Sequence, residues 1–146
     1  MRADELTTFL HRSIPLTRAL AVRVSSAGDG HVRLEAPLEP NLNHHGTAFG
    51  GSLATLGILA GWTVLHMSLD EAGIAASLVV RHVELDYLAP VSGDLVAEST
   101  LPLDEWPRFV DTLQQGRRAR IEVHSLLRGD AEAVRVRACY VALPPT

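Results

Sequence analysis

The stretch Asn41–Trp62, NLNHHGTAFGGSLATLGILAGW, decides the fold of this chain. It opens with asparagines, histidines and glycines, and then continues without a formal charge as far as Asp70. An uncharged apolar run of about twenty residues predicts one long helix that is buried on most of its sides. Because other elements must cover such a helix, we expect the rest of the chain to wrap around it.

A membrane-spanning helix is the other interpretation of this run, since residues 49–69 are long enough to cross a bilayer. Against it, the run holds four glycines and five polar residues, and no positively charged flank marks an orientation. We therefore expect a helix buried inside the protein and no membrane insertion. Residues 1–15 are polar and lack the apolar core of a signal peptide, which favours a cytoplasmic location.

The remaining chain is typical of strands joined by hairpins. Alternating patterns predict strands over residues 19–28, 31–38, 76–90, 93–103, 118–130 and 132–143. Turns at Gly28–Gly30 and Arg128–Asp130 join two pairs of these strands, so the sheet is expected to be mostly antiparallel. A short helix is predicted over residues 2–14, and residues 104–116 form either a second short helix or a connection.

These elements predict an α+β fold in which a curved antiparallel sheet wraps around one long central helix. Gly50 and Ala54 are four residues apart, as are Gly57 and Gly61, so each pair shares one face of the helix. Small side chains on that face let the sheet approach closely. At 146 residues the chain has the length of one domain, and we expect a single domain over residues 1–146.

The loop before the helix resembles a motif of the phenylacetate-type acyl-CoA thioesterases, which have the hot-dog fold. That motif is Asn-x-x-Gly-x-x-His-Gly-Gly, and residues 43–51, NHHGTAFGG, match it everywhere except at the histidine, which is Phe49 here. Residues 86–94, DYLAPVSGD, look like a strand end and turn of the same superfamily. The segments HGTAFGGSL and LAGW are more closely similar to the thioesterase-like domain in the C-terminal part of YiiD-type proteins.

This resemblance covers nearly the whole chain and implies the hot-dog fold, in a homodimer or a tetramer. It implies an acyl thioester as substrate, either acyl-CoA or acyl-carrier protein, and hydrolysis as the reaction. In the phenylacetate-type group a helix aspartate, seven residues after the second glycine, acts as nucleophile or base. That position is Ile58 here, so the resemblance does not supply the base.

Physical chemistry gives the motif a role of its own. The first turn of a helix offers unpaired N–H groups and the positive end of the helix dipole. Gly50 and Gly51 would present such donors to the oxyanion of a thioester, with no Cβ in the way. Asn43 would hold the loop or orient a water molecule. The alternative is that Asn43, Gly46 and the two glycines only shape a sharp turn into the helix.

Three side chains are candidates for the missing general base. His44 and His45 precede the helix, and a neutral imidazole can accept a proton near pH 7. The alternative is that both are ordinary side chains of the loop with no role in the reaction. The resemblance to hot-dog proteins implies that the strand over 76–90 pairs with its twin in a dimer, so Asp86 would supply a carboxylate across that dimer. That strand is predicted to place His82, Glu84 and Asp86 on one face and Val79, Arg81, Val83 and Leu85 on the other. The alternative for the polar face is contact with solvent.

Further residues near the motif are candidates for substrate contact. These are Gly46, Thr47, Phe49, Ser52, Thr55 and His82. Ser52 has a commoner alternative role as a helix cap. Thr55 lies one turn into the helix and faces either the acyl tunnel or the sheet. Tyr87 is expected to pack in the dimer interface.

Composition excludes several other classes of function. The net charge of −4 argues against non-specific binding of nucleic acid. Lysine is absent, so the chain has no Schiff-base chemistry, and its single cysteine cannot form an intrachain disulfide. The histidines have no metal-ligand spacing, and we expect neither a metal nor a cofactor.

Two alternatives to hydrolysis remain. One is a non-catalytic acyl-CoA binding or regulatory module. The other is a hydratase, which needs a histidine paired with a carboxylate.

Overall fold

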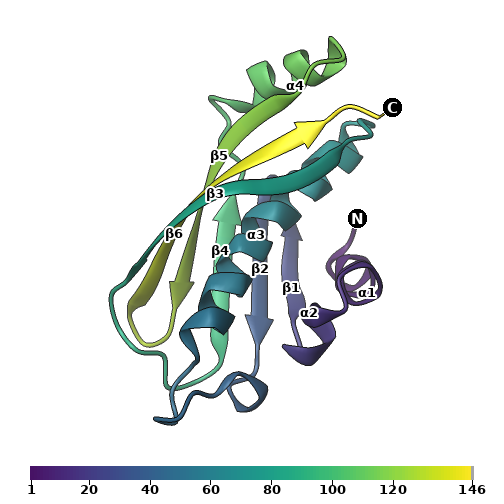
Figure 1. Ribbon diagram of the computed structural model, residues 1–146. Helices are drawn as coiled ribbons and strands as arrows, with labels where there is room; N and C mark the ends of the chain where they lie inside the picture. The colour runs from purple at the N-terminus through teal and green to yellow at the C-terminus, as the bar shows by residue number, and fades with distance from the viewer. Residues whose placement is uncertain (146) are drawn as a thin grey trace.

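Six antiparallel strands form one curved sheet around a long helix in the computed structural model, which describes residues 1–145 (Figure 1). The elements are α1 (Ala3–Ser13), α2 (Leu16–Ala19), β1 (Arg23–Gly28), β2 (His31–Ala36), η1 (Glu39–Asn41), α3 (Gly50–Glu71), β3 (Ser77–Tyr87), β4 (Leu95–Thr100), α4 (Trp106–Gln114), β5 (Ala119–Arg128) and β6 (Glu132–Leu143). The strand order is β1-β2-β4-β5-β6-β3. The α+β architecture predicted from the sequence is confirmed. The short helices α2 and η1 were not expected, and the strand predicted over residues 19–28 begins only at Arg23, because α2 and a turn precede it.

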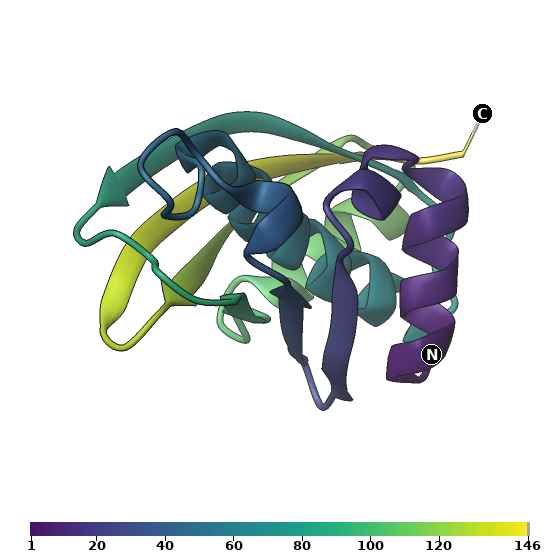
Figure 2. The same cartoon turned by 90° about the horizontal axis from the view of Figure 1, so that it is seen from below.

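The central helix α3 lies in the concave side of the sheet (Figures 1 and 2). It is long and apolar enough to cross a membrane, yet 72% of its most apolar segment is buried inside the protein. Such burial is typical of the core helix of a soluble protein, which confirms the interpretation of residues 49–69 as a buried helix.

Two glycines of α3 allow the sheet to approach the helix. A Cβ atom on Gly57 would lie 2.6 Å from Val136 Cγ2, and one on Gly61 would lie 2.4 Å from the hydroxyl oxygen of Tyr140. Tyr140 is fully buried, and its hydroxyl donates a hydrogen bond to the carbonyl of Ile58 in the same helix. Burial raises the pKa of this phenol, which keeps the donor protonated. The predicted role of small residues on this face is therefore confirmed at both positions.

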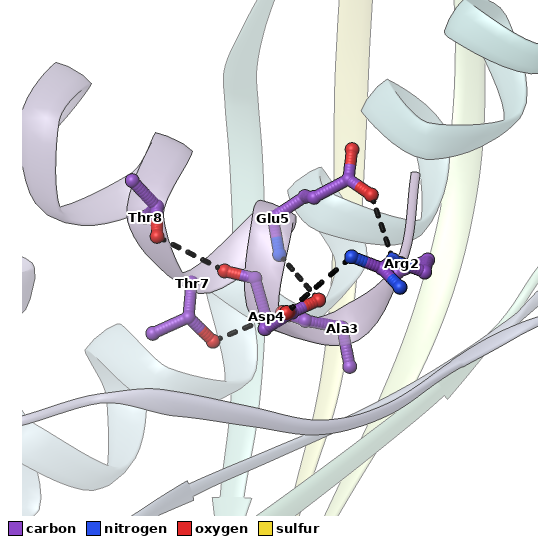
Figure 3. A network of polar contacts seen from close by, with 6 residues as sticks. All are labelled: Arg2, Ala3, Asp4, Glu5, Thr7 and Thr8. Carbon is purple, nitrogen blue, oxygen red and sulfur yellow. Dashed lines mark hydrogen bonds and ion pairs between the residues drawn. The ribbon is translucent and has the colours of Figure 1, made fainter.

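The first edge of the sheet, β1, is covered by α1 (Figure 2). Leu6 and Leu10 of α1 are fully buried, and the Thr7 hydroxyl accepts a hydrogen bond from the Val24 N–H at 2.9 Å. The start of α1 is held by polar contacts, shown in Figure 3, including a 2.9 Å bond from the Arg2 guanidinium to Glu5. The Val24 N–H at the β1 edge therefore has a partner within the protomer.

At the opposite edge, β3 pairs with no strand of residues 1–145 other than β6. A β-bulge lies between Val80 and His82, so that Arg81 has no partner residue on β6. Such a bulge shifts the alternation of side chains by one residue.

The bulge corrects one prediction about this strand. Val79 lies opposite Val141, on the outer face of the sheet with His82, Glu84 and Asp86. The expectation that Val79 shares a face with Val83 and Leu85 is therefore wrong, because the extra residue at Arg81 reverses the alternation before it.

Candidate functional site

The loop before α3 is organised by Asn43. Its side-chain oxygen accepts hydrogen bonds from the N–H groups of His45 and Thr47, at 2.8 and 3.1 Å. Its side-chain nitrogen donates to the Thr47 hydroxyl at 2.8 Å and to the Ala48 carbonyl at 3.3 Å. Gly46 adopts a φ of +80°, in the left-handed region that favours glycine, and thereby closes the turn that begins at Asn43. Of the two roles considered for Asn43, the geometry fits holding the loop.

A second asparagine, which the motif did not single out, anchors this loop to the rest of the protein. The Asn41 side chain is buried and donates to the carbonyls of Leu20 and Pro37, at 3.0 and 2.8 Å. Its backbone carbonyl accepts the Phe49 N–H at 2.7 Å. This bond satisfies the amide of the residue that directly precedes α3.

The N-terminus of α3 then presents three remaining donors. Phe49 is the N-cap residue, and no side chain among residues 1–145 caps the helix. The N–H groups of Gly50, Gly51 and Ser52 have no partner inside the helix, because their acceptors would lie before its start. Ser52 is buried as the third helical residue, so the alternative role of a cap does not apply to it. These donors and the helix dipole form a site suited to an oxyanion.

Two aromatic side chains flank these donors. The Phe49 ring lies over Gly51, where an added Cβ would be 2.4 Å from Phe49 Cε2. The Tyr87 hydroxyl, at the end of β3, donates to the Gly50 carbonyl at 2.9 Å. Tyr87 was expected in a dimer interface, and within the protomer its hydroxyl binds the first turn of α3. Phe49 and Tyr87 are each 55% exposed, and Gly50 and Gly51 are themselves partly exposed, so the helix start is open to a ligand from solvent.

His44 and His45 occupy the tip of the loop. They are the central residues of the turn from Asn43 to Gly46, and both side chains are exposed. Their rings are 3.9 Å apart between centroids and tilted by 43°. The structure therefore places both imidazoles in the loop that leads into α3, free of hydrogen bonds to the residues described.

An apolar groove of about 370 Å³ runs along α3 beside the β3 edge. It is lined by Ile14, Thr55, Ile58, Leu59, Trp62, Leu78, Val79 and Val80. Thr55 is part of this lining, so it faces the groove rather than the sheet, and its hydroxyl donates to the Gly51 carbonyl at 2.8 Å. The groove therefore begins one helical turn from the unpaired N–H groups.

His82 and Asp86 lie elsewhere, on the outer face of the sheet. His82 contacts Glu84 at 3.3 Å, Glu84 pairs with Arg137, and Asp86 lies opposite Arg135. Within one protomer the structure does not bring either side chain to the N-terminus of α3. Over residues 1–145, no group of three or more His, Cys, Asp or Glu residues is arranged to hold a metal ion.

Comparisons with known proteins agree with this architecture. The model of the YiiD_C family, described as "Putative thioesterase (yiiD_Cterm)", matches residues 3–144. A protein named as a putative esterase of Halobacterium salinarum is 34% identical over 86 residues, which span 56% of this chain and 56% of that relative.

Two solved structures superpose on almost the whole chain. A protein of unknown function from Chlorobaculum tepidum has a TM-score of 0.93 at 28% identity and covers 98% of this chain and 94% of its own. A thioesterase of Shewanella oneidensis, itself named as putative, has a TM-score of 0.88 at 27% identity and covers 97% of both chains. Because the family model matches residues 3–144 and the sheet wraps around α3, the chain belongs to the YiiD_C thioesterase family and has the hot-dog fold.

Proposed function

We propose that this protein hydrolyses an acyl thioester, carried by coenzyme A or by acyl-carrier protein, at the N-terminus of α3. The observation that carries the proposal is the uncapped helix start beside an apolar groove of about 370 Å³. The N–H groups of Gly50 and Gly51 would bind the carbonyl oxygen, and the groove would take the acyl chain. Preorganised donors of this kind stabilise the negative charge that develops on that oxygen.

The reaction needs a water molecule and a group that removes its proton. The side chains of α3 provide no carboxylate before Asp70, and Ile58, inside the groove, stands where the phenylacetate-type thioesterases carry a helix aspartate. We therefore assign the general base to His44 or His45. Attack of water forms a tetrahedral oxyanion, the C–S bond then breaks, and the thiol and the carboxylic acid leave. Asp86 is a second candidate, and it requires a partner subunit because of its place on the outer face.

We further propose that the active form is a homodimer, or a tetramer built from such dimers, in the cytoplasm. The β3 edge is eleven residues long, and Val79 and Val80 on it are exposed. A long exposed edge strand is a template for pairing with another strand, and a second copy of β3 fits it.

A non-catalytic module that binds acyl-CoA is the second candidate function. Ile58 favours it, because this residue places a methyl-bearing side chain where the phenylacetate-type relatives carry a reactive carboxylate. Such a module keeps the groove and the helix donors but lacks a base.

The test measures thiol release from a panel of acyl-CoA thioesters, with calorimetric binding measured in parallel. Hydrolysis is expected, and a His44→Ala/His45→Ala variant should lose about 10²-fold in kcat, the lower end of what a general base supplies. His124→Ala, an exposed histidine paired with Glu122 on β5, is the matched control and should keep full activity. Binding without thiol release from any thioester supports the module instead. If the His44→Ala/His45→Ala variant keeps the full rate and the Asp86→Asn variant is slow, the general base is Asp86 instead.

A further inference from the structure

One stripe along α3 stays partly exposed, while most of the other residues between Ser52 and Leu69 are buried. It contains Gly51, Thr55, Ile58 and Trp62, spaced by four, three and four residues. This spacing places all four on one face of a helix. The stripe starts at the unpaired N–H groups and follows the apolar groove toward the helix C-terminus. A ligand held at Gly51 thus has one continuous surface along which to lie.

The chemistry of this surface favours a hydrocarbon. All eight lining residues are apolar except Thr55, and the Thr55 hydroxyl is already bonded to the Gly51 carbonyl at 2.8 Å. A polar or charged acyl group would lose its hydration in the groove without gaining a partner. An alkyl chain loses no hydrogen bonds by entering.

Trp62 spans from α3 to β3 at the far end of the stripe. Its indole N–H donates to the Leu78 carbonyl at 2.8 Å. One face of its ring stacks on His66, with centroids 4.9 Å apart and planes 8° apart, and His66 stacks in turn on Phe9 at 4.5 Å. Bonded at one end and stacked on one side, this indole is a fixed wall rather than a movable side chain.

We infer that Trp62 closes the groove and sets the longest acyl chain that the protein accepts. The inference rests on the proposed binding of an acyl thioester at Gly51. Trp62 lies eleven positions after Gly51, which is about 16 Å along a helix that rises 1.5 Å per residue. The substrates are therefore thioesters of alkyl chains of medium length, and longer chains meet the indole.

The experiment compares chain-length profiles of kcat/KM for straight acyl-CoA thioesters. Trp62→Ala should lengthen the longest accepted acyl chain by at least two carbons. The kcat/KM of the shortest chain that the native protein excludes should rise about tenfold, since each buried methylene is worth about 10-fold or more in discrimination. The kcat/KM of short-chain thioesters should change by less than threefold. Ile58→Trp is the opposite variant, which narrows the groove nearer to Gly51 and should shorten the limit. Trp106→Ala removes the other tryptophan, which packs on Phe109 in α4, and should leave the profile unchanged.

Binding separates this inference from the proposed function. If no thioester is hydrolysed, dissociation constants over the same series should still show a limit that Trp62→Ala lengthens. That result supports the inference while hydrolysis fails. An unchanged profile in both Trp62→Ala and Ile58→Trp, with folded protein, overturns it. Loss of the dimer in Trp62→Ala without a change in profile also overturns it, because the groove is then a contact between copies.

Discussion

Single residues fix the candidate site mainly by bonding to backbone groups. Asn41 links the loop to Leu20 and Pro37, Asn43 closes the turn, and Tyr87 holds the first carbonyl of α3. None of these bonds joins two side chains that do chemistry. Their common effect is to fix where the N–H groups of Gly50 and Gly51 point, and electrostatic stabilisation depends on such fixed geometry.

Tyr87→Phe tests this positioning role. The variant keeps the ring beside Gly50 and loses only the hydroxyl bond of 2.9 Å to its carbonyl. A hydrogen bond of this kind contributes about 0.5–1.5 kcal/mol, so kcat should fall about 2- to 10-fold. KM should stay within a factor of two, because the acyl groove is untouched. Steady-state kinetics on the best acyl-CoA substrate gives both constants.

Tyr140→Phe is its matched control, since Tyr140 also donates to a carbonyl of α3 but two turns further along, at Ile58. It should lower the free energy of unfolding by about 1 kcal/mol and leave kcat unchanged. Equal losses of kcat in the two variants would mean that Tyr87 acts only through stability.

At this scale the sequence identifies residues that act locally and misses those that act at a distance. Asn43 and Gly46 follow from the motif, because their bonds close within the loop itself. Asn41 lies in the same stretch, yet its amide reaches Leu20, twenty-one positions earlier, and no local pattern encodes that contact. Tyr87 meets Gly50 only because the strand β3 ends beside the start of α3.

At the scale of whole elements, the stability of the protein depends on how closely α3 packs against the sheet. Gly61→Ala should lower the free energy of unfolding by about 1–3 kcal/mol, the usual effect of overpacking a core. The new methyl group would lie 2.4 Å from the Tyr140 hydroxyl, which is fully buried and bonded to Ile58, so it has no room to move. Urea unfolding followed by circular dichroism measures the change.

Gly93→Ala is the control for Gly61→Ala, because nothing lies within 4 Å of a Cβ at Gly93 and its φ is not positive. It should be neutral or stabilising by up to about 1 kcal/mol, through the entropy of the unfolded chain. A Gly61→Ala variant as stable as the native protein would contradict the close packing.

The order and type of the main elements follow from alternation and from the uncharged run, because burial on one side of a strand leaves a period of two in the sequence. The bulge at Arg81 does not follow so directly. Its one sequence signal is the pair Val79–Val80, where two apolar residues interrupt the alternation before Arg81 and His82. A prediction that overlooks the bulge therefore assigns the wrong residues to the outer face of β3, and places Val79 on the wrong face.

The two edges of the whole sheet differ in how they are protected. On the β1 side, α1 supplies Thr7 to the Val24 N–H and His11 to the Val22 carbonyl at 2.7 Å. On the β3 side no element of residues 1–145 covers the edge, although that strand is nearly twice as long as β1. A long uncovered edge with exposed valines promotes association, which is the physical basis for expecting a dimer through β3.

The dimer can be tested by charging this edge. Val79→Glu/Val80→Glu removes two exposed apolar side chains and, in a symmetric pair of β3 strands, places four like charges close to one another. Light scattering at micromolar concentration should give a dimer mass for the native chain and a monomer mass for this variant. Leu103→Glu is the control: Leu103 is 74% exposed but lies in the connection between β4 and α4, and its variant should stay dimeric. A monomeric native chain, or a charged variant that remains a dimer, would place the contact between copies somewhere other than β3. Because Val79 and Val80 also line the apolar groove, the charged variant should lose affinity for acyl-CoA as well, while Leu103→Glu should keep it.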